Sequence, residues 1–227
     1  CDDGADDDGV AFAMLPPVTR RIISRPLCHA YPRLHHQNIA LRTAFLDKAL
    51  SAELGRCSSA TVCTLGAGFD GRCLRFREAN FVEIDLPHVI QQKQALVARA
   101  VRRRPKLAAA MERTRFYSAN LTSSTSATLA LRAGLEGAES IIFLCEALLI
   151  YLPSEAGAAL LKLCVEEARD AGSTSIVLCF ADSLPDVERC DMGSARLALE
   201  AAGFQLELDS WTPKPGLARH MGVARVL

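Results

Sequence analysis

Short apolar runs alternate with longer amphipathic stretches through most of this chain. Five runs rich in β-branched and aromatic residues predict strands, at 60–65, 80–85, 114–119, 140–146 and 175–182. The last two are apolar almost throughout, which is typical of strands buried on both faces of a sheet. Between the runs, apolar positions recur at helical spacing and predict helices at 87–104, around 126–133 and within 153–172. This alternation predicts a parallel sheet with helices on both faces.

Local signals mark the ends of two of these helices. Pro87 suits the first turn of the helix that stops before Pro105. In "PSEAGAALLKLCVEEARDAG" (153–172), Ser154 is expected to be the N-cap and Gly172 to end the helix.

The pattern differs before the first strand and after the fifth. Residues 29–54 have helical spacing and predict a helix that precedes the sheet. "GFQLELD" (203–209) alternates apolar and polar residues, and "HMGVARV" (220–226) is a second short strand. The Pro-rich link 210–219 is too short for a parallel crossover, which needs about a dozen or more residues. The last two strands are therefore predicted to pair antiparallel.

Composition narrows the class of protein. The chain has 227 residues, half of them hydrophobic, which fits one domain with a substantial core. Lys plus Arg and Asp plus Glu are balanced at 26 each, which does not favour nucleic acid or a membrane surface as partner. The longest apolar run, 141–152, is too short to span a bilayer and contains Glu146.

The cysteines and the first residues bear on localisation and domain limits. The nine cysteines include no C-x-x-C pair, and Cys63, Cys145 and Cys179 lie inside apolar runs, which favours reduced core thiols in a cytoplasmic protein. The start carries five aspartates within 1–10 and lacks the pattern of a signal peptide. Residues 1–28 are therefore expected to form an acidic, solvated tail and an N-terminal arm, with the domain at 29–227.

The candidate chemistry begins at "TLGAGFDGR" (64–72). Gly66, Gly68 and Gly71 spell G-x-G-x-x-G directly after the first predicted strand. Asp85 ends the second strand about 20 residues later, where a ribose-binding carboxylate is expected. Both a nicotinamide dinucleotide and S-adenosylmethionine (SAM) fit this pattern, and a sharp turn that binds nothing is the structural alternative.

Three features favour SAM over NAD(P). They are the antiparallel terminal pair, the helix before the first strand, and Glu146 within "FLCEALLIYL" (143–152). A carboxylate among apolar residues is costly to bury without a partner. At the end of its strand it would face the ligand cleft, where SAM's sulfonium and ammonium attract it and dinucleotide phosphates repel it. A salt bridge to a structural Arg or Lys is the alternative role of Glu146.

The chain resembles the leucine carboxyl methyltransferase family. The resemblance covers roughly residues 29–180, and four segments carry it. They are "RTAFLDKAL" (42–50), "VCTLGAGFDGRCLRF" (62–76), "VEIDLPHVIQQK" (82–93) and "FLCEALLIYLPSEAGAALL" (143–161). It implies an α/β fold: a Rossmann-like seven-stranded methyltransferase sheet, mostly parallel with an antiparallel C-terminal strand pair. It also implies a SAM-dependent methyltransferase domain at 29–227.

The same resemblance implies a set of cofactor-binding residues. Gly66, Ala67 and Gly68 would line the methionine end of SAM, and Asp85 would hold the ribose hydroxyls. Asn120 and Leu121 would lie beside the adenine. Glu146 would meet the amino-acid part of SAM, and Arg42 its carboxylate, with Arg33 as the rival for that role.

The resemblance also implies the reaction, O-methylation of a carboxylate on a small molecule or a protein C-terminus. Such an acceptor needs no strong general base, and the sequence offers no obvious catalytic residue. No metal site is expected, since His35 and His36 are adjacent and lack helical metal-pair spacing.

The chain departs from the family at several points. Gly71 stands where the family has Thr, and Asn120 where it usually has Asp. The N-terminal arm and the region after the fifth strand are short. A homologue that binds SAM without catalysis, and an NAD(P)-dependent oxidoreductase, are the alternatives.

Overall fold

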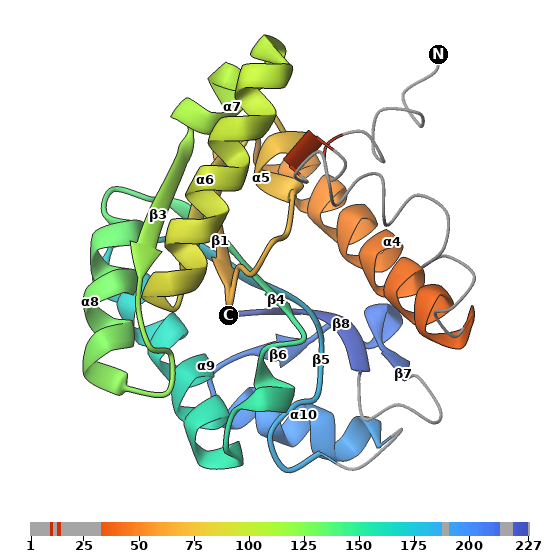
Figure 1. Ribbon diagram of the computed structural model, residues 1–227. Coiled ribbons are helices and arrows are strands. Elements are labelled where there is room, and N and C mark those ends of the chain that lie inside the picture. The colour runs from red at the N-terminus through yellow and green to blue at the C-terminus, as the bar shows by residue number, and fades with distance from the viewer. Residues whose placement is uncertain (1–9, 11–12, 15–32, 188–190, 214–219, 227) are drawn as a thin grey trace.

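The computed structural model describes residues 10, 13–14, 33–187, 191–213 and 220–226, with the side chains of 33–36 and 213 left out. Within this part of the chain the strands belong to one sheet (Figure 1). They are β1 (Thr61–Leu65), β2 (Asn80–Asp85), β3 (Thr114–Ser118), β4 (Ser140–Glu146), β5 (Ser175–Asp182), β6 (Gln205–Leu206), β7 (Thr212–Pro213) and β8 (His220–Arg225).

The strand order explains where a ligand can bind. Seven strands follow the order β3-β2-β1-β4-β5-β8-β6, and the short β7 pairs with β8 off this path. Strands β1 to β5 pair in parallel, whereas β8 runs antiparallel to β5 and β6. The predicted mostly parallel sheet with an antiparallel C-terminal pair is confirmed. The order reverses between β1 and β4, and such switch points form the ligand crevices of open α/β sheets.

The helices cover the sheet on two sides. They are α4 (Arg33–Arg56), α5 (Arg72–Arg75), α6 (Pro87–Arg103), α7 (Ala108–Glu112), α8 (Ser124–Leu135), α9 (Ser154–Asp170) and α10 (Met192–Ala201), with 3₁₀ turns η2 (Pro105–Leu107), η3 (Leu149–Tyr151) and η4 (Leu208–Ser210). Figure 1 shows α4 along one side of the sheet and α8 to α10 along the other. The predicted helices on both faces are confirmed.

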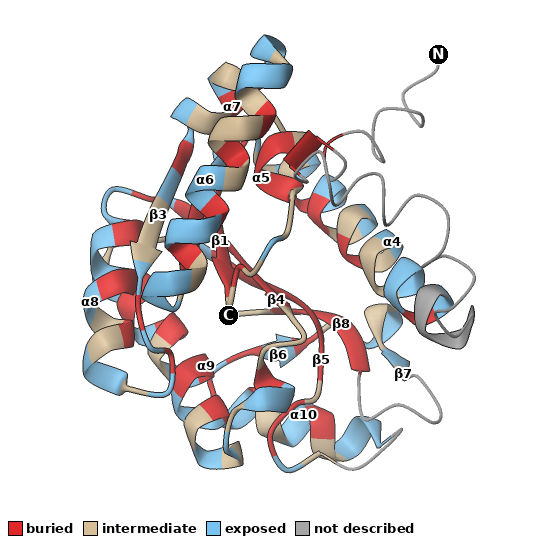
Figure 2. Ribbon diagram, viewed as in Figure 1, coloured by how far each residue is buried: buried red, intermediate tan, exposed pale blue. Residues whose placement is uncertain are grey.

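Alternate residues of the strands pack into two separate hydrophobic cores, one on each face of the sheet. In β4, Ile141, Phe143 and Cys145 pack with α8, α9 and α10. Ile142 and Leu144 pack with α4, α5 and α6 on the opposite face. Figure 2 shows the strands buried between helices whose outer faces are exposed. Because both sheet faces are covered, β4 has the continuous apolar sequence that predicted it.

The cysteines of the strands behave as core residues. Cys63, Cys145 and Cys179 are buried free thiols. Burial raises the pKa of each of these thiols, because a buried thiolate loses its hydration.

One predicted helix cap is wrong. The N-cap of α9 is Pro153, and no side chain caps this end. The hydroxyl of Ser154 instead donates to Oδ1 of Asp186 at 2.7 Å. The other end is as predicted, since α9 stops at Asp170 and Gly172 follows with φ +81°.

The predicted strand 203–209 is too long. Regular pairing is confined to Gln205–Leu206, and η4 begins at Leu208. The Ser210 hydroxyl accepts from the backbone N–H of Val223 at 2.8 Å, which takes up a donor that a longer β6 would have used. A side chain therefore ends this ladder, and the 3₁₀ turn leaves Leu208 exposed.

The N-terminal segment is described at three residues. Val10, Ala13 and Met14 have helical backbone and are buried in the core beside α4 and α6. Arg103 donates to the carbonyl oxygen of Ala13 at 2.8 Å. The predicted solvated tail is therefore wrong at Val10, and the rest of 1–28 lies outside the described residues. In the described part of the chain, no helix is long and apolar enough to cross a membrane.

Candidate active site

A cavity of about 630 Å³ opens where β1 and β4 end, beside α4. Its lining includes five of the residues predicted to bind the cofactor, namely Arg42, Gly66, Ala67, Gly68 and Glu146. This volume lies within the range of about 300–1,000 Å³ that is usual for small-molecule sites. The parallel register places the ends of β1, β2 and β4 at the same edge of the sheet.

The backbone of the glycine loop has dihedral angles that residues with a Cβ rarely adopt. Gly66 has φ +65° and Gly68 has φ +45°, both in the left-handed region. A Cβ on Gly66 would come within 2.8 Å of Cδ1 of Leu148, which follows β4. The loop is therefore bare backbone because the chain turns sharply there and a neighbouring loop packs against it.

Asp85 holds this loop from the end of β2. Its Oδ2 accepts from the N–H of Gly68 at 2.7 Å, and its Oδ1 accepts from the N–H of Leu86 at 2.6 Å. Each carboxylate oxygen has a second lone pair for a further donor. Asp85 does not line the cavity, but it accepts a hydrogen bond from Gly68, which does.

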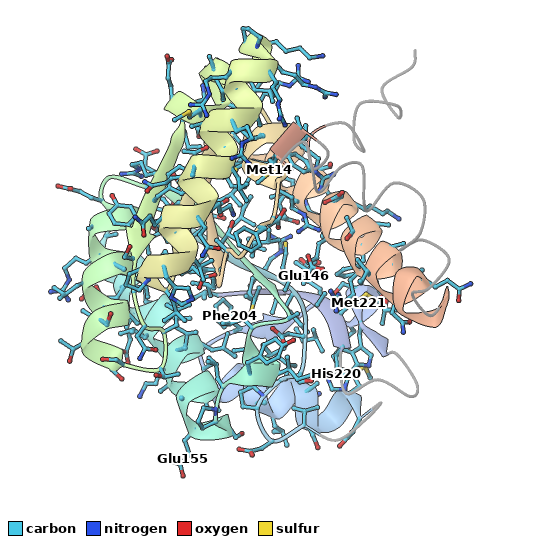
Figure 3. The ribbon with its side chains drawn as sticks, in the orientation of Figure 1. Met14, Glu146, Glu155, Phe204, His220 and Met221 are labelled. Atoms are coloured by element: carbon cyan, nitrogen blue, oxygen red, sulfur yellow. The ribbon has the colours of Figure 1, made fainter. Side chains whose placement is uncertain are left out.

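Glu146 ends β4 with its carboxylate shared between two arginines. Oε1 accepts from Nε of Arg42 at 3.2 Å, and Oε2 accepts from Nη1 of Arg72 at 2.8 Å. Figure 3 shows Glu146 inside the molecule, on the side where α4 lies. The predicted pair of Arg42 and Glu146 thus meets in the cavity, and the salt-bridge alternative for Glu146 also holds in this structure.

The residue after Glu146 has an unusual backbone. Ala147 has φ +53°, which is uncommon for a residue with a Cβ and costs about 1–2 kcal/mol. The buried carboxylate of Asp182 accepts from the backbone N–H groups of Leu148, Leu149 and Ile150 and fixes the turn that follows. Burial raises the pKa of Asp182, and these donors offset part of that rise. The strained turn is held in place by β5.

Arg72 is a central site residue that the sequence pattern did not single out. Its side chain is only 3% exposed. Nε donates to Asp47 at 2.6 Å, Nη1 donates to Asp70 as well as to Glu146, and Nη2 donates to the carbonyl oxygen of Thr43. Burial lowers the pKa of Arg72, but the three carboxylates outweigh burial and raise it.

Asp47 connects this arginine to a second one. Arg75 donates to both carboxylate oxygens of Asp47, at 2.7 and 2.9 Å. Burial raises the pKa of Asp47, yet the hydrogen bonds and charges of Arg75 and Arg72 bring it below its usual value. Three guanidinium groups, Arg42, Arg72 and Arg75, and two carboxylates, Asp70 and Glu146, therefore line the cavity, and Asp47 lies behind them.

A buried ion pair lies beneath the glycine loop. Lys93 of α6 is fully buried, donates to the carbonyl oxygen of Ala67 at 2.9 Å, and pairs with Glu83 of β2. Burial alone would lower the pKa of Lys93, but the Glu83 carboxylate raises it above its ordinary value. Lys93 lies between Ile90 and Val97 on the buried face of α6, and this position is the sequence signal that could have identified it.

The predicted adenine residues lie outside the cavity lining. The Asn120 carbonyl oxygen accepts from the N–H and the hydroxyl of Thr122, at 3.1 and 2.8 Å. Leu121 is buried in the core that faces α8 and α9. The backbone links this segment to the site, because Ala119 donates to the carbonyl oxygen of Asp85 at 2.8 Å. The side chains of Arg33, His35 and His36 lie outside the described residues.

Comparison with known proteins now decides between the two cofactors. A family model described as leucine carboxyl methyltransferase matches residues 7–165, which is more than half of the chain. The chain belongs to the leucine carboxyl methyltransferase family. It is a SAM-dependent methyltransferase, and the nicotinamide alternative is set aside. No curated protein sequence matches the chain.

Solved structures agree with this family's fold. The magnesium protoporphyrin IX methyltransferase of Synechocystis PCC 6803 with bound SAH has a TM-score of 0.55 and 15% identity, covering 99% of this chain and 97% of that chain. The 1,6-didemethyltoxoflavin-N1-methyltransferase of Burkholderia thailandensis, with bound 1,6-didemethyltoxoflavin and S-adenosylhomocysteine, has a TM-score of 0.51 and 16% identity, covering 93% and 91%. At these identities the likeness shows the fold alone.

The residues that line the cavity fit SAM chemically. Gly66 and Gly68, both in the left-handed region, present bare backbone to the cavity. The cavity also offers a guanidinium and a carboxylate side by side, Arg42 and Glu146, which match the two charges of an amino-acid group.

Proposed function

We propose that this methyltransferase transfers the methyl group to a carboxylate oxygen of a small molecule or a peptide tail. The supporting observation is the chemistry of the cavity wall. It carries Arg42, Arg72 and Arg75, and among the described lining residues there is no His, Lys, Cys or Tyr. Its two carboxylates, Asp70 and Glu146, both accept hydrogen bonds from Arg72. The site is poorly suited to remove a proton, because both of these carboxylates are ion-paired with Arg72.

A carboxylate acceptor does not need a residue in the cavity wall that removes a proton. It is already an anion near neutral pH, so it attacks without a general base. SAM supplies an electrophilic methyl group on a sulfonium, and the carbon–sulfur bond breaks with its electron pair staying on sulfur. The protein's contribution is then to hold the acceptor oxygen in line and to exclude water.

The proposed cofactor placement uses the geometry of the loop and of the arginines. Gly66, Ala67 and Gly68 face the methionine end, and Asp85 accepts from the ribose hydroxyls through its remaining lone pairs. The amino-acid carboxylate pairs with Arg42 and the ammonium pairs with Glu146. Asn120 and Leu121 lie on the adenine side.

A labelling experiment tests the acceptor. The protein is incubated with methyl-labelled SAM and with peptides that end in a free carboxylate, or with metabolite extracts, and the product is treated with mild alkali. Carboxyl methyl esters release methanol under these conditions, whereas N-methyl and ether methyl groups remain. We expect volatile label, and label that survives alkali would contradict the carboxylate proposal.

A second candidate is a homologue that binds SAM without turnover. The observation that favours it is Asn120, whose carbonyl oxygen already accepts two hydrogen bonds from Thr122 and is exposed. The same incubation distinguishes the two candidates. Steady methyl transfer eliminates the binding-only role, whereas tight SAM binding with no transfer to any acceptor supports it.

A further inference from the structure

Arg72 and Arg42 hold Glu146 in different ways. The side chain of Arg72 is 3% exposed and that of Arg42 is 15% exposed. Arg72 reaches carboxylates on α4, on the loop after β1 and at the end of β4, namely Asp47, Asp70 and Glu146. Arg42 donates to Glu146 through Nε and enters no other ion pair found among the described residues. Arg72 is therefore held by three carboxylates, whereas Arg42 has one carboxylate partner among the described residues.

We propose that Arg72 is a positioning residue that holds Glu146 in place and thereby makes the site select ligands with an amino-acid group. This inference rests on the proposed cofactor placement. The ligand carboxylate takes Arg42 away from Glu146, and the ligand ammonium replaces Arg42 at Oε1. Arg72 keeps Oε2, so the carboxylate of Glu146 stays oriented during the exchange.

The planar guanidinium is needed for this role. Nε and Nη1 of Arg72 donate in different directions to three carboxylates at once. A lysine ammonium has the same charge but presents it as one point at the end of a flexible stem. Arg72→Lys therefore keeps the charge of the cavity wall and removes the geometry that orients Glu146.

Two ligands distinguish a positioning role of Arg72 from a general contribution of Arg72 to the stability of the fold. S-adenosylhomocysteine carries the amino-acid group, and 5′-methylthioadenosine has the same adenosine and thioether but lacks that group. Calorimetry gives Kd for both ligands with wild type and Arg72→Lys. We expect Arg72→Lys to weaken S-adenosylhomocysteine about 10- to 100-fold, the scale of a lost charged hydrogen bond, with 5′-methylthioadenosine changed less than about threefold.

Arg225 provides the matched control. It also bridges two carboxylates, Glu53 and Glu207, and one of these is on α4, but it does not touch Glu146. Arg225→Lys is expected to lower the melting temperature while the ratio of the two Kd values stays at the wild-type value. An arginine that merely stabilises the fold would affect both ligands alike.

The outcomes separate this inference from the proposed function. Wild type that binds neither ligand overturns the proposed cofactor site itself. Wild type that prefers S-adenosylhomocysteine, with the same preference in Arg72→Lys, overturns the role of Arg72 alone. If Arg72→Lys does not fold, Asp47→Ala takes its place, because it removes the acceptor of Nε and leaves Arg72 in the chain. An unchanged preference in Asp47→Ala overturns the inference.

Discussion

At the scale of single residues, backbone conformation explains why the glycine loop has its sequence. Gly66 and Gly137 both have positive φ, +65° and +73°. A Cβ at Gly66 meets Leu148 at 2.8 Å, whereas a Cβ at Gly137 meets nothing within 4 Å. Gly137 therefore needs glycine only for its φ, and Gly66 needs it for both φ and space.

Alanine at these two positions gives the first prediction. Gly137→Ala is expected to cost about 1–2 kcal/mol of unfolding free energy, from backbone strain alone. Gly66→Ala is expected to cost more, because Leu148 must move, and to weaken S-adenosylhomocysteine binding as well. Urea unfolding and calorimetry on both variants provide the measurement. Equal costs with unchanged affinity for both would contradict the close packing of the loop.

At the scale of elements, one charged residue fastens a helix to the sheet. Lys93 brings α6 to β2 through Glu83 and to the glycine loop through Ala67. A buried ion pair of this kind is costly to break, because the remaining charge loses its partner and has no water.

Removing that lysine gives the second prediction. Lys93→Met is expected to lower the free energy of unfolding by about 3–5 kcal/mol, since Glu83 is left buried and unpaired. Lys162→Met, in the exposed α9 pair with Glu166, is expected to cost less than about 0.5 kcal/mol. The double variant Glu83→Leu with Lys93→Met should recover much of the loss. Denaturant melts check all three, and a small effect of Lys93→Met alone would show that the pair contributes little.

At the scale of the whole molecule, ion pairs fasten α4 to the sheet at two places. Asp47 and Arg42 connect it to the site, through Arg72 and Glu146. Near the C-terminal end of the helix, Glu53 pairs with Arg225 of β8. The helix that closes one wall of the cavity is thus bound to the sheet by charges as well as by Leu46 and Leu50 in the core.

Acid sensitivity of this attachment gives the third prediction. The folded-state pKa of Asp47 lies below 3.8, so the unfolded chain binds its proton first as pH falls. The stabilisation from Asp47 is therefore complete above that value and is lost on further acidification. The difference in unfolding free energy between wild type and Asp47→Asn should stay constant from about pH 7 to 5 and shrink below 3.8. Carboxylates outside the Arg72 network cancel from this difference, and a flat difference down to about pH 3 would contradict the prediction.

The strands and the cofactor loop could be predicted because their signals are local. Within 140–146, residues 141–145 are all apolar and all buried, and the glycines mark a turn wherever it occurs. The sequence patterns, by contrast, do not predict helix α10, and they make the strand at 203–209 too long because the hydroxyl of Ser210, outside that run, ends the ladder. Long-range contacts of this kind leave no periodic pattern.

The charged part of the site was harder to predict for a related reason. Glu146 was noticed because it interrupts an apolar run, and Arg42 came from the family pattern. Arg72 and Asp47 each lie near another charged residue in sequence, Arg75 and Lys48, and no local pattern shows which of these charges is buried. Their burial depends on partners 25 residues apart in sequence, which only the folded chain brings together.

The place of β8 in the sheet also sets an order of assembly. It is the last described strand along the chain, yet it lies between β5 and β6. Within the described residues β6 pairs with β8 and with no other strand, so residues 205–206 remain without a ladder until 220–225 arrive. During synthesis β6 leaves the ribosome before β8. Until β8 follows, β5 has no described neighbour on that side of the sheet. Closure of this edge therefore waits for β8, and among the described strands β8 is the one whose loss would leave two others, β6 and β7, unpaired.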